Sequence, residues 1–167
     1  LPGVGQFGSA ARQLERTGLR AALNDFLATG RPFLGICLGM QLLFETSDED
    51  PSVRGLGYFA GRIGRLEAAR LPHIGWTTVE PVAPGEDSIF RGLPRSFFAY
   101  FAHSYAAPPG IPCLAAAASC PPAFAAAVRG GEVWGVQFHP EKSGADGLAI
   151  LERFARRAGR RGETGPS

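Results

Sequence analysis

The hydrophobic positions of the first thirty residues follow a helical spacing. Apolar side chains recur at three- and four-residue steps, at Leu14, Leu19, Leu23, Phe26 and Leu27. Ser9 is a residue type that caps helix starts, so we expect a helix to begin there. Gly18 is expected to divide the segment into two helices, and Gly30 to end the second one.

A short apolar run over residues 32–36 follows a turn, which predicts a buried parallel strand. Beyond Cys37, residues 38–44 predict a short helix, and the acidic segment 45–50 predicts a loop.

From residue 57 to residue 138, short apolar segments alternate with Gly and Pro, which predicts strands joined by turns. These strands are expected at residues 58–63, 73–79, 97–101, 113–119, 124–128 and 133–138. The pair Gly130-Gly131 predicts that the last two strands form a hairpin.

After Pro140, residues 145–158 predict an amphipathic helix. Its buried stripe is expected at Leu148, Leu151, Phe154 and Ala155, and residues 159–167 are expected to form a frayed tail. Helices around a parallel strand, followed by hairpins and a closing helix, predict one α/β domain over residues 1–158. We expect three layers, a mixed central sheet and a β-rich extension.

Composition and charge exclude several classes of protein. A chain of 167 residues is the size of one domain, and 45% hydrophobic against 19% charged residues excludes disorder along the whole chain. Sixteen Arg and one Lys against 15 acidic residues leave a net charge of +2, too small for a dedicated nucleic-acid binder. No apolar run approaches the roughly 20 residues of a membrane span.

Three cysteines, Cys37, Cys113 and Cys120, form no CxxC pair. A disulfide scaffold is therefore not expected, and a cytoplasmic location fits best. A metal site built from these cysteines and the histidines is an alternative, but the spacings match no zinc pattern.

The segment Gly35-Ile36-Cys37-Leu38-Gly39 has the form of a nucleophile elbow, with cysteine at its tip. Side chains at the two glycine positions would clash as strand and helix close up. Cys37 would lie at a helix N-terminus, which favours a thiolate, and the Leu38 N–H would point toward an oxyanion. The alternative is a buried structural cysteine.

In the segment His139-Pro140-Glu141, the two ionisable side chains are two residues apart and project the same way in extended chain. A carboxylate beside an imidazole fixes its tautomer and supports the imidazolium. Together with Cys37, they could supply a nucleophile, a base and an orienting acid. A structural histidine and a solvated surface acid are the alternatives.

These motifs, GICLGMQ followed by GVQFHPEKS, resemble the class I, triad-type glutamine amidotransferases. Three further segments, LPGVG at residue 1, PHIGW at residue 72 and YFAHSY at residue 100, resemble the HisH family. These are the glutaminase subunits of imidazole glycerol phosphate synthase, in histidine biosynthesis. The resemblance runs from residue 1 to about residue 154 and implies a flavodoxin-like fold, L-glutamine as the substrate, and no metal or other cofactor.

The resemblance implies a role for each matching residue. The residues that match the catalytic triad are Cys37, His139 and Glu141. Those that match the oxyanion hole are Val4, Gly5 and Leu38. Those that match positions for the substrate glutamine are Gln41, Glu49, Ser104 and Tyr105. A solvated Glu49 and strand-end positions for Ser104 and Tyr105 remain alternatives.

The family also pairs this subunit with a cyclase, HisF, a TIM barrel that receives the ammonia, so a heterodimer is expected. Positions near that interface are matched by His73, Trp76, Tyr100 and Lys142. The alternatives are a core tryptophan at Trp76 and a solvated charge at Lys142.

The family begins with a DYGxGN-like strand that nothing here matches. We therefore expect an upstream strand–helix–strand unit to be missing, although Leu1 could also be a natural or processed terminus.

Two other functions stay open at this point. One is a different enzyme on the same scaffold, such as a γ-glutamyl hydrolase or another Cys-His-Glu amidotransferase subunit. The other is a binding subunit whose triad is inert. The PGVG, PHIGW and HSY segments favour the glutaminase subunit over the first of these.

Overall fold

The computed structural model describes residues 1–82 and 85–162 and has an α/β architecture. The helices are α1 (Phe7–Arg16), α2 (Leu19–Ala28), α3 (Leu38–Gln41), the 3-10 helix η1 (Pro140–Lys142) and α4 (Gly144–Gly162). The strands are β1 (Pro2–Gly3), β2 (Phe33–Cys37), β3 (Phe44–Ser47), β4 (Phe59–Arg65), β5 (His73–Pro81), β6 (Phe97–His103), β7 (Tyr105–Ala106), β8 (Leu114–Ala118), β9 (Phe124–Gly130) and β10 (Val133–Val136).

The main sheet has seven strands in the order β1-β2-β10-β9-β8-β5-β6. Strand β2 pairs in parallel with both β1 and β10, whereas the remaining pairs are antiparallel. A second sheet has the order β3-β4-β7. The mixed sheet, the parallel strand and the β9–β10 hairpin are therefore confirmed.

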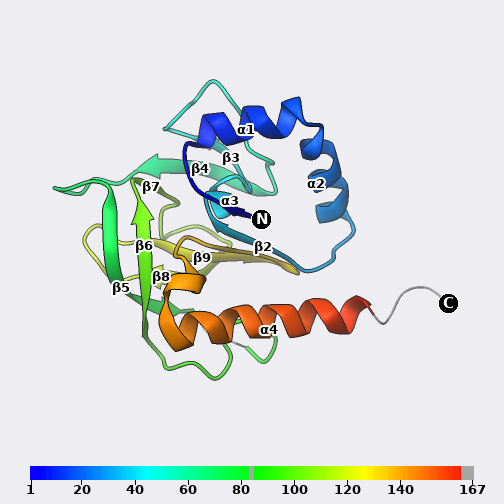
Figure 1. Ribbon diagram of the computed structural model, residues 1–167. Helices are drawn as coiled ribbons and strands as arrows, with labels where there is room; N and C mark the ends of the chain where they lie inside the picture. Colours follow the sequence, from blue (N-terminus) through cyan, green and yellow to red (C-terminus); the bar gives the residue numbers. More distant parts are fainter. Residues whose placement is uncertain (83–84, 163–167) are drawn as a thin grey trace.

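Alternating side chains of the central strands enter two different hydrophobic cores. Leu34 and Trp134 pack on one face together with Ile150 of α4. Phe33 and Val133, their chain neighbours, pack on the other face with residues of α2, α3 and the small sheet. Figure 1 shows α4 on one side of the main sheet and α1 and α2 on the other. The three-layer prediction is confirmed.

The first helices depart from the prediction at their boundaries. Helix α1 begins at Phe7, with Ser9 inside it, because the Phe7 N–H donates to the carboxylate of Glu49 at 2.6 Å. The division at Gly18 is confirmed, since this residue has φ 72° between α1 and α2. Helix α3 is shorter than predicted and ends at Gln41.

Part of the acidic segment that was expected to be a loop is strand β3. Its residues pair in parallel with β4, as in Phe44 with Phe59 and Ser47 with Ile63. Phe44 and Ser47 are buried in this pairing, which is why hydrogen bonding across the small sheet overrides the polar local sequence.

The predicted buried stripe of α4 is confirmed in part: Leu151 and Phe154 pack against the core, whereas Ala155 is exposed. Leu148 is 55% exposed, whereas Ile150 is fully buried. The cause is the close approach of α4 to η1 at Gly147, where a Cβ would lie 2.1 Å from the Pro140 carbonyl oxygen. Helix α4 continues to Gly162, beyond the predicted end, and residues 163–167 lie outside the described part.

In the ranges described, no helix has both the length and the apolar content needed to cross a bilayer.

His103 at the end of β6 is a buried titratable group in this core. Its ring centroid lies 4.8 Å from that of Phe124 and 5.5 Å from that of His73. Nδ1 lies 2.9 Å from the carbonyl oxygen of Tyr105. The pKa of His103 is lowered to about 4, mainly by burial and to a smaller extent by the nearby imidazoles of His73 and His139, whereas the hydrogen bond to the Tyr105 carbonyl opposes this shift.

We predict that the free energy of unfolding falls as the pH drops from 6.5 to about 4. The unfolded chain protonates His103 near its usual pKa of 6.5, but the folded chain only near pH 4, so protons favour unfolding in this window. The expected loss is about 3 kcal/mol by the lower end.

Urea denaturation across this pH range measures the effect. The variant His103→Gln should show a smaller pH dependence than the natural sequence, because the other titrating groups are unchanged. Equal pH dependences for the two proteins would contradict the assignment to His103.

Candidate active site

Cys37 lies at a sharp turn between the end of β2 and the start of α3. Its backbone has φ 53° and ψ −109°. Of the non-glycine residues that the structure describes, it is the one with a positive φ. A strained residue at a strand-to-helix turn is the geometry of a nucleophile elbow, which supports the interpretation drawn from the GICLG segment.

The two glycines that flank the turn cannot carry side chains. A Cβ on Gly35 would lie 2.6 Å from the carbonyl oxygen of Gly39, and a Cβ on Gly39 would lie 1.8 Å from the carbonyl oxygen of Leu1. Both contacts involve backbone, which cannot move aside cheaply. The predicted clash is confirmed, and Leu1, the residue just before β1, proves to be one of its partners.

A cavity of about 340 Å³ opens above this turn. It brings together most of the residues singled out in the sequence. They are Val4, Gly5, Cys37, Leu38, Gln41, Glu49, Ser104, Tyr105, His139 and Lys142, with Pro72, Ala102 and His103 completing the wall. Segments from the first loop, the elbow, the end of β6 and the β10–η1 turn therefore meet at one place.

His139, on this wall, forms a close pair with Glu141. His139 Nδ1 lies 2.8 Å from Glu141 Oε1; the imidazole is buried and the carboxylate is about half exposed. A proton on Nδ1 would be shared with the carboxylate, which leaves Nε2 as the acceptor. Its backbone is fixed as well, because the His139 N–H donates to the Tyr100 carbonyl at 2.9 Å.

The ionisation of Cys37 differs from the prediction. Burial raises the pKa of the Cys37 thiol, and the negative charge of Glu141 adds to this, whereas the Leu38 N–H and Lys142 lower it. The expected preference for a thiolate is wrong for the unliganded chain, because α3 has only four residues and cannot offset burial of the sulfur. The thiol needs a base before it can act as a nucleophile.

Gln137 is a site residue that the sequence reasoning missed. Its Nε2 donates to Cys37 Sγ at 3.7 Å, and its Oε1 accepts from Gln41 Nε2 at 3.1 Å. Gln41 also donates to the Tyr105 carbonyl at 2.9 Å. The position of Gln137 two residues before His139, near the end of the strand predicted over residues 133–138, was the available signal.

The loop of Val4 and Gly5 borders the cavity next to the elbow. Gly3 of β1 pairs with Cys37 of β2, so the loop that follows starts at the level of the sulfur. Val4 is 79% exposed and Gly5 has φ 107°. Glu49 faces the same cavity while its carboxylate holds the first N–H of α1, so it is not merely solvated.

Trp76 and Tyr100 lie opposite each other on β5 and β6, with ring centroids 6.3 Å apart. Trp76 is 56% exposed, so it is not a core residue. Lys142 Nζ lies 5.8 Å from the Tyr100 ring centroid. His73 is separated from this group: it lies on the inner face of β5, where its Nε2 contacts Thr77 Oγ1 at 2.9 Å.

Within residues 1–82 and 85–162, no group of three or more His, Cys, Asp or Glu side chains is arranged to hold a metal ion. The cavity itself offers the chemistry of its side chains and backbone amides. It holds a cysteine, a histidine oriented by a carboxylate, and amide groups around them, which is a set suited to acyl transfer through a thioester.

The chain was compared with known proteins. Residues 1–158 match the family described as glutamine amidotransferase class-I. The chain is 44% identical over 161 residues to imidazole glycerol phosphate synthase subunit HisH of Thermococcus kodakarensis, covering 93% of this chain and 80% of that protein. It is 43% identical to imidazole glycerol phosphate synthase hisHF of Arabidopsis thaliana, covering 92% of this chain but 26% of that much longer protein.

A solved structure described as a glutamine amidotransferase has the same fold, with a TM-score of 0.68 at 20% identity. The superposition covers 95% of this chain and 77% of the other. The chain therefore belongs to the class-I glutamine amidotransferase family and, within it, to the HisH subunits of imidazole glycerol phosphate synthase.

Proposed function

We propose that the chain hydrolyses L-glutamine to glutamate and ammonia as the glutaminase subunit of imidazole glycerol phosphate synthase, in histidine biosynthesis. The observation that carries this proposal is the strained Cys37 at the end of β2, in one cavity with an imidazole that Glu141 orients. The proposed steps use no metal and no other cofactor.

In the first half-reaction, Cys37 Sγ attacks the carboxamide carbon of glutamine. The sulfur transfers its proton to His139, because burial keeps the free thiol protonated. The negative oxygen of the tetrahedral intermediate is stabilised by the Leu38 N–H and by the loop of Val4 and Gly5. The imidazolium then donates its proton to the leaving nitrogen, the C–N bond breaks, and ammonia departs from a γ-glutamyl thioester.

In the second half-reaction, water replaces ammonia. Neutral His139 removes a proton from the water while the oxygen attacks the thioester carbon. The C–S bond breaks, the proton returns to the sulfur, and glutamate leaves. Glu141 stabilises the imidazolium in both halves without taking up its proton.

The substrate glutamine is held along the wall between α3 and the end of β6. We assign this role to Gln41, Glu49, Ser104 and Tyr105, which border the cavity around Cys37. Gln41 is buried and fixed by its bonds to Tyr105 and Gln137. A fixed amide beside the nucleophile can position the substrate without further ordering cost.

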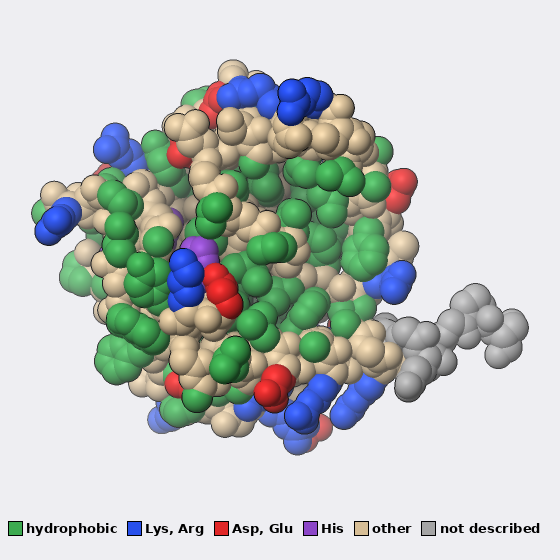
Figure 2. All heavy atoms as spheres, in the orientation of Figure 1, with side chains coloured by type: hydrophobic (Ala, Val, Ile, Leu, Met, Phe, Trp, Pro, Cys, Tyr) green, Lys and Arg blue, Asp and Glu red, His purple; other side chains and the backbone are tan. Residues whose placement is uncertain are grey.

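The partner would be the cyclase subunit HisF, with a TIM-barrel fold, which uses the ammonia to form imidazole glycerol phosphate and AICAR. Ammonia released into water takes up a proton and loses its nucleophilic lone pair, so a covered route is needed. Three large exposed side chains, Ile74, Trp76 and Phe98, lie on one face of β5 and β6. Figure 2 shows hydrophobic side chains gathered on this side of the molecule, beside a histidine.

This surface is continuous with the active site. Contacts run from Trp76 to Tyr100 and from Tyr100 to the ring of His139, at centroid distances of 6.3 and 6.5 Å. A partner seated on the exposed face would therefore cover the mouth of the cavity. We assign Trp76, Tyr100 and Lys142 to this contact, with His73 supporting it from the inner face.

We predict that Cys37→Ala lowers glutamine-dependent synthesis by the complex on the order of 10⁴-fold. Synthesis from added ammonium salts should remain, because the cyclase chemistry does not use the thiol. Product formation is measured with each nitrogen source in turn. The variant Cys120→Ala is the matched control and should behave like the natural sequence, whereas equal loss of both activities would contradict the proposal.

We predict that Glu141→Gln lowers kcat for glutamine hydrolysis roughly tenfold to a hundredfold with little change in KM, since the charge that supports the imidazolium is lost. Exposure of Glu141 to water moderates the effect. Steady-state kinetics with Glu152→Gln, an exposed acid on α4, provide the control. A rise in KM at constant kcat would assign Glu141 to binding instead.

We predict that Trp76→Ala weakens binding to the cyclase roughly tenfold to a hundredfold, as expected for a central aromatic residue. Titration calorimetry of the two subunits measures this. Leu148→Ala removes an equally exposed apolar side chain from α4 and should leave the affinity unchanged. If both variants bind normally, the β5–β6 face is not the interface.

A further inference from the structure

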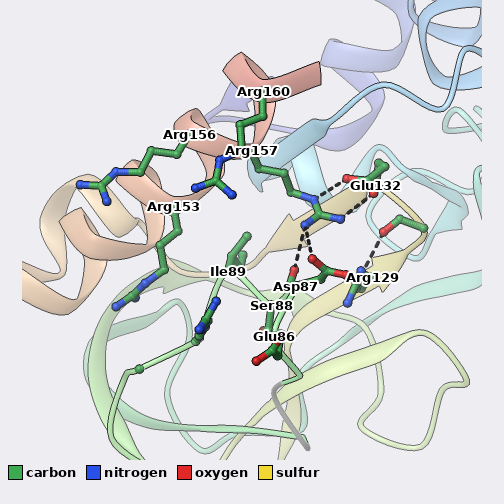
Figure 3. Close-up of a pocket in the computed structure, with 13 residues that line it drawn as sticks. Glu86, Asp87, Ser88, Ile89, Arg129, Glu132, Arg153, Arg156, Arg157 and Arg160 are labelled. Carbon is green, nitrogen blue, oxygen red and sulfur yellow. Dashed lines mark hydrogen bonds and ion pairs between the residues drawn. The ribbon is translucent and has the colours of Figure 1, made fainter. Parts of the chain in front are cut away.

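A second pocket, of about 780 Å³, lies at the opposite end of β10 from His139. Its walls come from α4, from the β9–β10 turn at Gly131 and Glu132, and from residues 86–92. Figure 3 shows arginines on α4 along one side of the pocket, with Arg157 reaching across to Glu132 and Asp87. None of the proposed catalytic or substrate residues lines it, so its chemistry is unused by the glutaminase reaction.

The pocket is lined mainly by charged groups, and the positive ones outnumber the negative ones. Its guanidinium groups belong to Arg91, Arg129, Arg153, Arg156, Arg157 and Arg160. Its carboxylates belong to Glu86, Asp87 and Glu132. Because twice as many cations as anions face the same space, the pocket carries a positive potential that favours an anionic ligand.

Four of these arginines lie on one face of α4, at positions 153, 156, 157 and 160. Steps of three and four residues place like charges side by side, and such pairs repel each other. Arg157 is compensated, because it donates to both oxygens of Glu132 and lies 3.3 Å from Asp87. Arg156 reaches the exposed Glu152 at 3.6 Å.

The remaining cations in the pocket have no acidic partner among the residues that the structure describes. Arg153 Nη1 is buried and has no hydrogen-bond partner. Arg129 donates to the Gly131 carbonyl at 3.0 Å and stacks over Trp134 at 4.7 Å, without meeting a carboxylate. An N–H donor without a partner in a positively charged pocket, such as Arg153 Nη1, would be satisfied by a bound anion.

We propose that this pocket binds a small molecule that bears a phosphate group. Guanidinium groups bind phosphate through pairs of parallel hydrogen bonds, and the three oxygens and the charge of nearly two of one phosphate group can engage several guanidinium groups at once. The volume lies in the range of small-molecule sites. Ile89 supplies the only large apolar side chain among the lining residues, and no aromatic ring is among them. This lining favours a ligand that is recognised mainly through its phosphate.

Calorimetric titration of the full chain at fixed ionic strength tests the proposal. The probes are sodium tripolyphosphate and ribose 5-phosphate, which separate a free oligophosphate from a sugar phosphate ester. Saturable binding of at least one probe is expected. The double variant Arg153→Gln/Arg160→Gln should weaken it about tenfold or more, while glutamine hydrolysis stays unchanged, because neither residue contacts the active site.

The control is Arg16→Gln/Arg70→Gln, which removes the same charge from exposed positions outside the pocket. It should bind as the natural sequence does. Arg91→Gln, in an exposed loop, gives a second variant should the helix variant be unstable, and it too should weaken binding. The absence of saturable binding, or equal weakening in the control, would overturn the proposal.

Discussion

Backbone packing at the end of β2 is the constraint on which the rest of the site depends. The turn at Cys37 closes only because Gly35 and Gly39 let the backbone of α3 and of Leu1 approach within contact distance. That approach holds Cys37 at a positive φ, where the sulfur faces the cavity. The strain at one residue is thus supported by two glycines and a neighbouring strand.

The direction of the parallel strands separates two kinds of chemistry in the molecule. Strands β1, β2 and β10 all run toward the cavity, so the loop of Val4 and Gly5, Cys37 and His139 follow their carboxyl ends, as ligand sites do in open α/β sheets. The pocket lined by arginines lies instead at the amino end of β10. The two pockets lie at opposite ends of β10 and share no lining residue.

The parts of the structure that could be predicted are those set by local sequence. The elbow at Cys37, the pair His139 and Glu141, and most strand positions follow from residue types within a few positions of each other. Features made by distant contacts could not be predicted. Glu49 caps α1 across 42 residues, and Gln137 reaches Cys37 across 100. The raised pKa of Cys37 likewise depends on how much of the fold covers it.

The pairing of β2 with β10 has a consequence for how the reacting groups can move. Ile36 stands beside Val136 in this ladder, one step before Cys37 on one strand and shortly before Gln137 and His139 on the other. The Gln137 amide, which donates to the sulfur, and the His139 imidazole thus belong to one backbone segment, while the Cys37 thiol belongs to the neighbouring strand. Side chains of both strands are buried in the two hydrophobic cores, so this ladder opens only when the domain itself unfolds. The spacing between the thiol and the imidazole is therefore as rigid as the core.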